Sequence, residues 1–290
     1  MTRDYVNNIP YIQGQGNLGA VDGSSAAASR YTEVKLDPSA DWLLMDGVDS
    51  GAVPMVPNYD QRLKEPSLLP VKIPMILLNG VPKGSIGVGF ASIIPPHSVN
   101  DVAAATKYVL NCMINGENPT IDKIMETLKG PDFPTGGIVG PTSEIKKMYE
   151  TGSARLIIRS KATIETNGKS SRIIITEIPY NITTTDIVND IAEAVVGKKD
   201  TKTKLRLPPT VPEVKAVRDE TTTNRKTKKV DVRIVVDVKN NEDPNVVLEK
   251  LMQYTSLQED FAPNMVALNS NRQPIQVNIF DIIDTWINLS

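Results

Sequence analysis

The sequence predicts an α+β protein, and three observations support this fold class. Several segments repeat apolar residues at helical spacing between capping residues, which is typical of amphipathic helices. Other segments are β-branched runs or alternate polar with apolar residues, as strands do. Between residues 66 and 76, three prolines resist helix and favour an extended crossing. We therefore expect a boundary between two parts of the chain at this tract.

The helices of the first half are expected after the proline tract. Residues 1–65 are rich in Gly, Ala and Asp and suit short strands and tight turns. The first long helix is expected at 102–114, with Asn100 as its N-cap and Gly116 just past its end. Two shorter helices are expected at 121–128 and 144–149.

Strands and helices alternate in the second half. Residues 156–158 and 172–175 are predicted strands joined by a hairpin-like stretch through 167–169, and 230–238 alternates as a further strand. Helices are expected at 183–196 and after Asp243 and Pro244, which suit the N-cap and first helical positions. From Asn278 onward an apolar stripe predicts a last helix, which either docks on its own domain or needs a partner or continuation.

Composition limits the possible environments and sites. The chain has 290 residues, 40% hydrophobic and 23% charged, which fits one or two globular domains with a real core. The net charge of -2 gives no overall signal for a polyanionic partner, so nucleic-acid binding would need local clusters. One cysteine, Cys112, excludes an internal disulfide and suits the core of a protein from a reducing compartment. One histidine and one cysteine also exclude a His/Cys metal site within the chain.

The sequence gives no sign of a membrane or secretory role. No apolar run approaches the roughly 20 residues that span a bilayer. Residues 1–5 lack the apolar core of a signal peptide. We therefore expect a cytoplasmic protein.

The candidate chemistry centres on Arg30 and Tyr31, which follow the small residues 26–29. Tyr31 is the only credible covalent nucleophile in the sequence. A phenol with its ordinary pKa of about 10 attacks phosphorus only with help in losing its proton. The Arg30 guanidinium can hold a phosphate oxygen, and the small residues let the backbone approach a bulky polyanion. The dipeptide alone is common, and the ordinary alternative is a half-buried tyrosine in a strand.

The surroundings of this pair carry a family resemblance. Five motifs follow one another along the chain: 11–19, Val56-Pro57-Asn58-Tyr59-Asp60, Leu77-Leu78-Asn79-Gly80, Ile94-Pro95-Pro96-His97 and 130–137. In this order and spacing they resemble the breakage-reunion subunit of type IIA DNA topoisomerases, a family that includes gyrase A, the matching subunit of topoisomerase IV and phage medium subunits. The similarity runs from about Tyr11 to the last residue, and divergence at several motif positions suggests a phage-like member.

The resemblance implies a fold and a reaction. Residues 1–65 would be the C-terminal part of a winged-helix domain, 66–277 an α/β tower domain, and 278–290 the start of a coiled coil. Tyr31 would attack a DNA phosphate and form a transient 5′-phosphotyrosine while Arg30 stabilises the growing charge. Two copies would cut opposite strands so that a second duplex passes through.

The resemblance also implies partners. The enzyme would be an ATP-hydrolysing type II topoisomerase, an isomerase, acting on double-stranded DNA as a pair of copies of this chain. Mg²⁺ and ATP would be held mainly by a separate partner subunit. The helix-turn-helix that normally precedes this region in the family is missing, so the chain would need that upstream half as well.

Two glycine-rich loops have separate expectations. The loop at 81–89 is either a buried anchor or, as the resemblance implies, a DNA-binding loop in which Ile86 wedges between base pairs and Lys83 contacts DNA. The loop at 14–19 is followed by no lysine and has no strand-to-helix context, so it does not match a P-loop or a Rossmann dinucleotide site. Its glycines suit a turn with positive φ, and the resemblance places it beside the tyrosine, although Gln13 replaces the usual Asp.

Other candidates remain open or are assigned no chemistry. His97 follows two prolines and is expected to be structural. The basic clusters at 198–206 and 225–229 are either a solvated hairpin or a phosphate-facing flank. Two further function classes compete with cleavage. One is a non-catalytic DNA-binding or assembly fragment, inactive without its upstream half and partner subunit. The other is a nucleotide-binding enzyme that uses the Gly-rich loop and would bind ATP alone.

Overall fold

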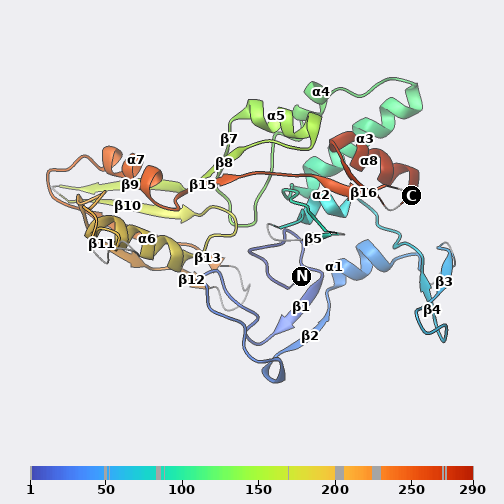
Figure 1. Cartoon of the computed structure of the whole chain (residues 1–290), viewed down its shortest axis with the longest axis horizontal. Coiled ribbons are helices and arrows are strands. Elements are labelled where there is room, and N and C mark those ends of the chain that lie inside the picture. Colours follow the sequence, from blue (N-terminus) through green and yellow to red (C-terminus); the bar gives the residue numbers. More distant parts are fainter. Residues whose placement is uncertain are drawn as a thin grey trace.

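The computed structural model has the mixed helices and strands of an α+β protein, which confirms the predicted class (Figure 1). The residues that the structure describes are 2–48, 51, 53–82, 86–87, 89–168, 170–199, 206–223, 230–269, 271 and 273–289.

The N-terminal part consists of short elements with little packing between them. Strands β1 (Ile12–Gln15) and β2 (Glu33–Leu36) form an antiparallel pair, and a 3-10 turn, η1 (Ser29–Tyr31), precedes β2. A hairpin of β3 (Met55–Pro57) and β4 (Lys64–Pro66) follows. These elements confirm the expected short strands and turns. The helical stretch formed by α1 (Pro38–Ala40) and η2 (Asp41–Met45) was not predicted.

The unpredicted helical stretch has a local cause. Asp37 accepts a hydrogen bond from the Ser39 N–H at 2.8 Å, and Pro38 occupies the first helical position. Asp as N-cap and Pro at the first position are the residues that begin helices. The pattern is hard to recognise from sequence because the helical stretch is short and ends at Met45.

Helices and one small sheet build the first core. The helices are α2 (Met75–Asn79), α3 (Val99–Asn115), α4 (Ile121–Met125), α5 (Thr142–Thr151) and α8 (Ile279–Leu289). The antiparallel sheet has the order β15-β8-β7, from β15 (Gln258–Phe261), β8 (Leu156–Arg159) and β7 (Ile138–Gly140). Short pairs are made by β5 (Ile86–Gly87) with β6 (Phe90–Ala91) and by β16 (Val266–Leu268) with β17 (Pro274–Gln276). Leu77, Val102, Tyr149 and Ile283 are among the fully buried residues of this core.

A four-stranded antiparallel sheet and two helices build the second core. The strand order is β11-β14-β10-β9, from β9 (Lys161–Asn167), β10 (Ser170–Glu177), β11 (Val214–Asp219) and β14 (Ile234–Val238). The helices are α6 (Thr184–Val196) and α7 (Pro244–Tyr254), with a minor strand pair of β12 (Thr222–Thr223) and β13 (Val230–Asp231). Ile173 and Val236, which are paired across β10 and β14, pack in one core with Ile187 of α6 and Leu251 of α7. Both helices therefore cover the same face of the sheet, at the left of Figure 1.

Two helix expectations are corrected by the structure and two are confirmed. Helix α3 begins at Val99 after Ser98, so the expected N-cap at Asn100 is wrong, whereas Gly116 ends the helix in the left-handed conformation as predicted. Val99 is exposed and therefore lies outside the apolar pattern that marks the buried face. Helix α4 ends at Met125, three residues before the predicted end. Helix α6 is confirmed with Thr183 as N-cap in a capping box, and α7 begins at Pro244 after Asp243 as predicted.

The strand expectations need two corrections. Strand β8 does not form a hairpin with β10, because β9, which was not predicted, lies between them in sequence and is the strand that pairs with β10. The predicted strand at 230–238 is interrupted, since β13 ends at Asp231 and β14 begins at Ile234. The cause lies at Arg233, whose carbonyl accepts from the Glu220 N–H at 2.7 Å and whose N–H donates to the Thr221 hydroxyl at 3.1 Å.

The last helix docks on the first core. Asn278 caps α8, because its side-chain oxygen accepts from the Asp281 N–H at 3.0 Å while Asp281 accepts from the Asn278 N–H at 2.8 Å. Ile279 and Ile283 are fully buried in the first core. The Trp286 indole N–H donates to the Val71 carbonyl at 2.8 Å and so ties α8 to the proline-rich tract.

Candidate functional site

Arg30 and Tyr31 lie together on the surface at the end of the η1 turn. The Tyr31 side chain is exposed, at 66% of its full accessible area. The Arg30 guanidinium carbon lies 4.8 Å from the centre of the Tyr31 ring, within the range of a cation–π contact. The turn is fixed locally, because the Thr32 hydroxyl and N–H both donate to the Ser29 carbonyl at 3.2 Å. A phenol and a guanidinium are thus presented to solvent side by side.

The glycine-rich loop after β1 supports this turn. Gly16 has a φ of +93°, and a Cβ at this position would lie 2.6 Å from the Tyr31 carbonyl oxygen. Gly19 has a φ of +98°. Asn17 holds the loop, since its side-chain oxygen accepts from the Gly19 N–H at 2.8 Å and its carbonyl accepts from the Ala27 N–H at 2.9 Å. The expected positive φ is confirmed at Gly16 and Gly19, and the loop packs against the tyrosine backbone.

The same loop lacks the features of a nucleotide site. Strand β1 ends at Gln15, and the next helical element in the described residues is the three-residue turn at Ser29. A cavity of about 840 Å³ lies along β1 and β2, and its lining mixes Arg3 and Lys35 with Glu33 and Asp37. A phosphate cradle needs backbone N–H groups at a helix N-terminus. The geometry therefore gives the nucleotide-binding class no support.

The β5–β6 hairpin has a well-defined neck. Val81 and Ile94 exchange two backbone hydrogen bonds of 2.7 and 3.1 Å. Gly80, just before the neck, has a φ of +64°, and a Cβ there would lie 2.2 Å from the Ile94 carbonyl oxygen. The backbone of Ile86 pairs with Ala91. The Ile86 side chain and all of Lys83 lie outside the described residues, so their expected DNA contacts stay predictions.

His97 is a core residue beneath this hairpin. It is 1% exposed; its Nδ1 lies 3.1 Å from the Leu77 carbonyl oxygen and its Nε2 lies 3.0 Å from the Tyr149 hydroxyl. Because a carbonyl only accepts, Nδ1 carries the proton and the Tyr149 hydroxyl donates to Nε2. Burial lowers the pKa of His97 to about 4, with smaller opposing effects from backbone hydrogen bonds. Its role is structural, in agreement with the prediction. Cys112 is likewise buried, as predicted.

Only part of the basic clusters falls within the described residues. Lys198 and Lys199 are exposed, and Lys198 lies 3.7 Å from Glu193. Lys202, Lys204 and the cluster at 225–229 lie outside the described residues. The choice between a solvated hairpin and a phosphate-facing flank therefore stays open.

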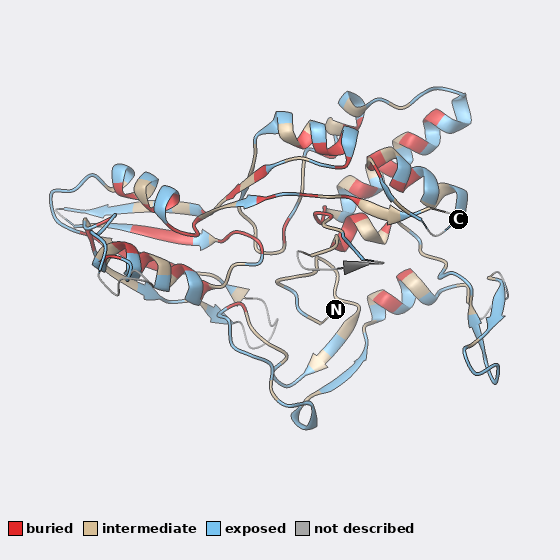
Figure 2. Ribbon diagram, viewed as in Figure 1, coloured by how far each residue is buried: buried red, intermediate tan, exposed pale blue. Residues whose placement is uncertain are grey.

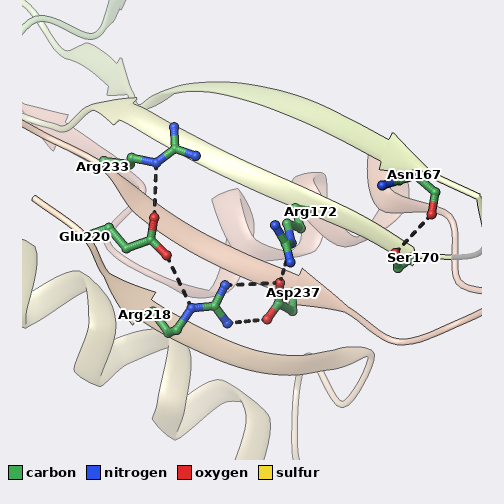
Figure 3. A network of polar contacts seen from close by, with 7 residues as sticks. All are labelled: Asn167, Ser170, Arg172, Arg218, Glu220, Arg233 and Asp237. Atoms are coloured by element: carbon green, nitrogen blue, oxygen red, sulfur yellow. Dashed lines mark hydrogen bonds and ion pairs between the residues drawn. The ribbon is translucent and has the colours of Figure 1, made fainter.

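A charged network that the sequence did not predict covers the outer face of the four-stranded sheet (Figure 3). Asp237 on β14 binds Arg218 on β11 through both carboxylate oxygens and lies 3.1 Å from the Arg172 Nε on β10. The Glu220 carboxylate links two arginines. It accepts a hydrogen bond from the Arg218 Nε at 3.4 Å and one from the Arg233 Nε at 3.2 Å. The hydrogen bond from Arg218 is the main reason that the pKa of Asp237 is lowered.

The network ties three strands together and uses these arginines internally. Each of the guanidiniums of Arg172, Arg218 and Arg233 is paired with a carboxylate. They brace the sheet and do not form a free phosphate-binding surface. The only local signal is that β10, β11 and β14 each contain charged residues among apolar ones. The register that places them on one face was not available from the sequence.

Metal and membrane features are absent from the part of the chain that the structure describes. No group of three or more His, Cys, Asp or Glu side chains in these residues is placed to hold a metal ion. No helix within the same ranges is long and apolar enough to cross a bilayer.

Comparison with known proteins gives a consistent family. A family model described as the A subunit of DNA gyrase/topoisomerase IV matches residues 1–290. The DNA gyrase A subunit of Kosmotoga olearia is 38% identical over 287 residues, covering 99% of this chain and 32% of the relative. With the same coverage, the DNA gyrase A subunit of Chlamydia trachomatis is 38% identical and the DNA topoisomerase 4 A subunit of Streptococcus pyogenes is 37% identical.

The extent of these matches decides what they show. The chain spans about one third of the length of the curated relatives it matches. The family model, in contrast, matches the chain from its first residue to its last. The chain therefore belongs to the family of A subunits of DNA gyrase and topoisomerase IV.

Proposed function

We propose that this chain is part of the DNA cleavage and religation subunit of a type IIA topoisomerase, with Tyr31 as its nucleophile. The observation that carries the proposal is the exposed Tyr31 phenol with the Arg30 guanidinium against its ring. Covalent chemistry needs a nucleophile that substrate can reach, and charge development on phosphate needs a nearby cation. Both requirements are met at one surface turn. Family membership supplies the reaction class.

The proposed reaction is an in-line exchange of phosphoester bonds. The Tyr31 oxygen, having lost its proton, forms a bond to phosphorus while the bond to the 3′ oxygen breaks and that oxygen takes up a proton. The chain is left on the 5′ end of the DNA, and the reverse attack by the 3′ hydroxyl reseals the strand. Arg30 stabilises the charge on the non-bridging oxygens. Because the phosphotyrosine conserves the ester bond, resealing needs no ATP.

The rest of the assembly belongs to the same proposal. Two copies of this chain cut opposite strands of one duplex in the cytoplasm, and a partner subunit holds Mg²⁺ and hydrolyses ATP. When bound, Mg²⁺ would lower the charge at the reacting phosphate. The described residues of this chain include no acidic cluster for the ion.

The domain assignment and the DNA-bending loop are also proposed. Residues 1–65 form the end of a winged-helix domain, 66–277 a tower domain, and 278–290 the first turns of a coiled coil. Ile86 wedges into the duplex and Lys83 contacts it. The hairpin position of Ile86, on β5 and paired with β6, is compatible with a projecting wedge.

A second candidate is a non-catalytic DNA-binding or assembly fragment. The observation in its favour is that the chain spans only 32% of the length of the relatives. It predicts duplex binding without covalent capture, even with a partner subunit present.

The deciding experiment is covalent capture of DNA. The chain is mixed with the ATPase subunit, the upstream half of an A subunit, Mg²⁺ and plasmid, and the reaction is stopped with denaturant. We expect protein on the 5′ ends of cut DNA, loss of this product in Tyr31→Phe, and duplex binding nearly unchanged. Tyr59→Phe is the matched control, since Tyr59 is also an exposed tyrosine of the N-terminal part. Capture by Tyr31→Phe would place the nucleophile elsewhere, and binding without capture by the wild type would favour the second candidate.

Two further variants test the supporting roles. Arg30→Ala should slow cleavage by roughly 10²–10³-fold, the usual loss for one group that stabilises transition-state charge. It should leave the thermal unfolding temperature unchanged, because Arg30 is exposed and belongs to neither hydrophobic core. Ile86→Ala should reduce DNA bending, measured by energy transfer between labelled duplex ends, and reduce cleavage with it.

A further inference from the structure

The segment just before β1 is tied to the base of the β5–β6 hairpin by Asn79. The Asn79 side-chain N–H donates to the Ile9 carbonyl at 2.8 Å, and its side-chain oxygen accepts from the Ile9 N–H at 2.8 Å. Asn79 is 6% exposed, so water does not compete for these bonds. It also contacts the hydroxyl of Tyr11. One buried amide thus satisfies both backbone groups of a residue 70 positions away.

Asn8 adds a second set of bonds at the same place. Its side-chain amide lies 3.2 Å from the Leu78 carbonyl, 3.2 Å from the His97 carbonyl and 2.9 Å from the Asp132 carbonyl. An amide has two hydrogens, so one of them is shared between two acceptors. The three carbonyls come from separate segments that meet at the base of the hairpin.

On the hairpin side these asparagines join the hydrogen-bonded neck of Val81 and Ile94. Asn79 is followed directly by Gly80 and by Val81, which pairs with Ile94. His97 closes the same neck, because its N–H and its Nδ1 both reach the Leu77 carbonyl. A movement of the hairpin base therefore moves Asn79.

On the other side the bonds lead to the tyrosine. Three residues after Ile9, β1 begins and pairs with β2 over its whole length. The Asp37 N–H donates to the Tyr11 carbonyl at 3.0 Å and so fixes the far end of β2 to the segment that holds Ile9. Gly16, just past β1, lies against the Tyr31 carbonyl. A continuous series of backbone and amide contacts thus connects Asn79 with Tyr31.

We infer that Asn79, assisted by Asn8, is a positioning residue that makes the hairpin and the Tyr31 turn respond as one unit when a duplex is bent. This inference rests on the proposed function. Asn79 touches no reacting atom, and it acts by transmitting the position of the hairpin base to β1. Cleavage then depends on bending through this contact, because a nucleophile displaced by about 1 Å can lose as much as 100-fold in rate.

A double-mutant cycle with a matched asparagine tests this coupling. Asn264 also holds the hairpin, since its side chain donates to the Ala91 carbonyl at 2.9 Å and its backbone pairs with Ile93, and its bonds lead away from the N-terminal segment. In the complete assembly we expect Asn79→Ala to lower covalent capture by about tenfold, with duplex affinity changed by less than about twofold. Ile86→Ala should then cause little further loss in the Asn79→Ala background and its full loss in the Asn264→Ala background.

The outcomes separate this inference from the proposed function. If the losses from Asn79→Ala and Ile86→Ala multiply, the two sites act independently and the inference is wrong. Asn79→Asp, which keeps the acceptor for Ile9 and loses the donor, serves if the alanine variant fails to fold. Absence of covalent capture by the wild type, or capture that persists in Tyr31→Phe, would instead reject the proposed function.

A measurement without cleavage tests the coupling directly. Hydrogen exchange of the β1 and β2 amides is followed with and without duplex. We expect duplex to slow exchange in the wild type and in Asn264→Ala, and to leave it unchanged in Asn79→Ala. Slowing that persists in Asn79→Ala, or no slowing in the wild type, overturns the inference whatever the cleavage result.

Discussion

The N-terminal region at 2–69 and the region that follows it are held together by different forces. Among the described residues of the first, the buried apolar side chains are Val21, Ala40 and Leu43, and most of the region is exposed or intermediate (Figure 2). The second region contains most of both hydrophobic cores. Burial of apolar surface is the dominant stabilising contribution in folded proteins. Most of the folding free energy therefore comes from the second region, although the candidate nucleophile lies in the first.

Hydrogen bonds to the second region position the first. The Tyr180 hydroxyl donates to the Val6 carbonyl at 2.9 Å, and the Thr184 N–H donates to the Val21 carbonyl at 3.1 Å. The asparagine contacts at Asn8 and Asn79 act in the same way. We therefore expect substitutions near Tyr31 to change function with little change in stability. Substitutions in the two cores should mainly reduce stability.

The largest expected effect on stability comes from comparing a leucine-to-alanine substitution in each region. Leu251→Ala removes a fully buried side chain of the second core and should reduce the free energy of unfolding by about 2–5 kcal/mol. Leu36→Ala on β2 removes a side chain that is 51% exposed and should cost less than about 0.5 kcal/mol. Urea unfolding of the 290-residue chain measures both. Equal losses would show that the N-terminal region has a core of its own.

The next effect is a pH dependence that arises in the first core. Burial lowers the pKa of His97 from 6.5 to about 4, so the unfolded chain binds this proton more readily than the folded chain between these values. His97 therefore contributes full stability above pH 6.5, and this contribution is lost as the pH falls toward 4. The free energy of unfolding should therefore fall by about 3 kcal/mol through His97 over this pH range.

The control for this prediction is a variant without the imidazole. Unfolding free energies of wild type and His97→Gln are compared between about pH 7.5 and about pH 4.5, so that the carboxylates common to both cancel. The difference between the two proteins should shrink as the pH falls. Parallel curves would mean that His97 is protonated in the folded protein or accessible to water.

Local signals predicted where three helices of the second region begin. Thr183, Asp243 and Asn278 cap helices through their own side chains, so three or four consecutive residues contain the information. Tyr31 and Arg30 were found for a related reason, because adjacent residues share one turn. Strand β9 was missed because most of its side chains are exposed and it pairs with β10 alone, at the edge of the sheet.

Long-range contacts were not predictable from the sequence. Asn8 meets Leu78 across 70 residues, and nothing in the local pattern around Asn8 sets it apart. The arginines of the outer sheet face converge only after the register of three strands is known. Sequence patterns therefore identified the candidate nucleophile, whereas the contacts that position it required the folded chain.

A third prediction makes the same glycine substitution in both regions. Gly152 ends α5 with a φ of +74°, and a Cβ there would lie 2.1 Å from the Val277 carbonyl oxygen, so Gly152→Ala should cost about 2 kcal/mol of stability or more. Gly16→Ala introduces a similar conflict with the Tyr31 carbonyl, where fewer neighbours are buried. It should leave the main unfolding transition nearly unchanged and reduce covalent capture of DNA. Circular dichroism melting and the capture assay check the pair, and a large loss of stability in Gly16→Ala would contradict the comparison.

The smallest expected effect compares one ion pair from each region. Asp237 receives hydrogen bonds from Arg218 and pairs with Arg172, and its side chain is only 20% exposed, so Asp237→Asn should reduce the free energy of unfolding by about 1 kcal/mol at neutral pH after solvent screening. Asp60 lies 3.7 Å from Arg62, which is 85% exposed, and Asp60→Asn should have almost no effect. Because the pKa of Asp237 is lowered, its contribution should persist to below about pH 4 and then disappear as the carboxylate is protonated. Added salt should reduce the stability loss from Asp237→Asn only partly, since the network is partly shielded by the sheet. If Asp60→Asn lowered the free energy of unfolding as much as Asp237→Asn does, the geometry of the network would contribute nothing.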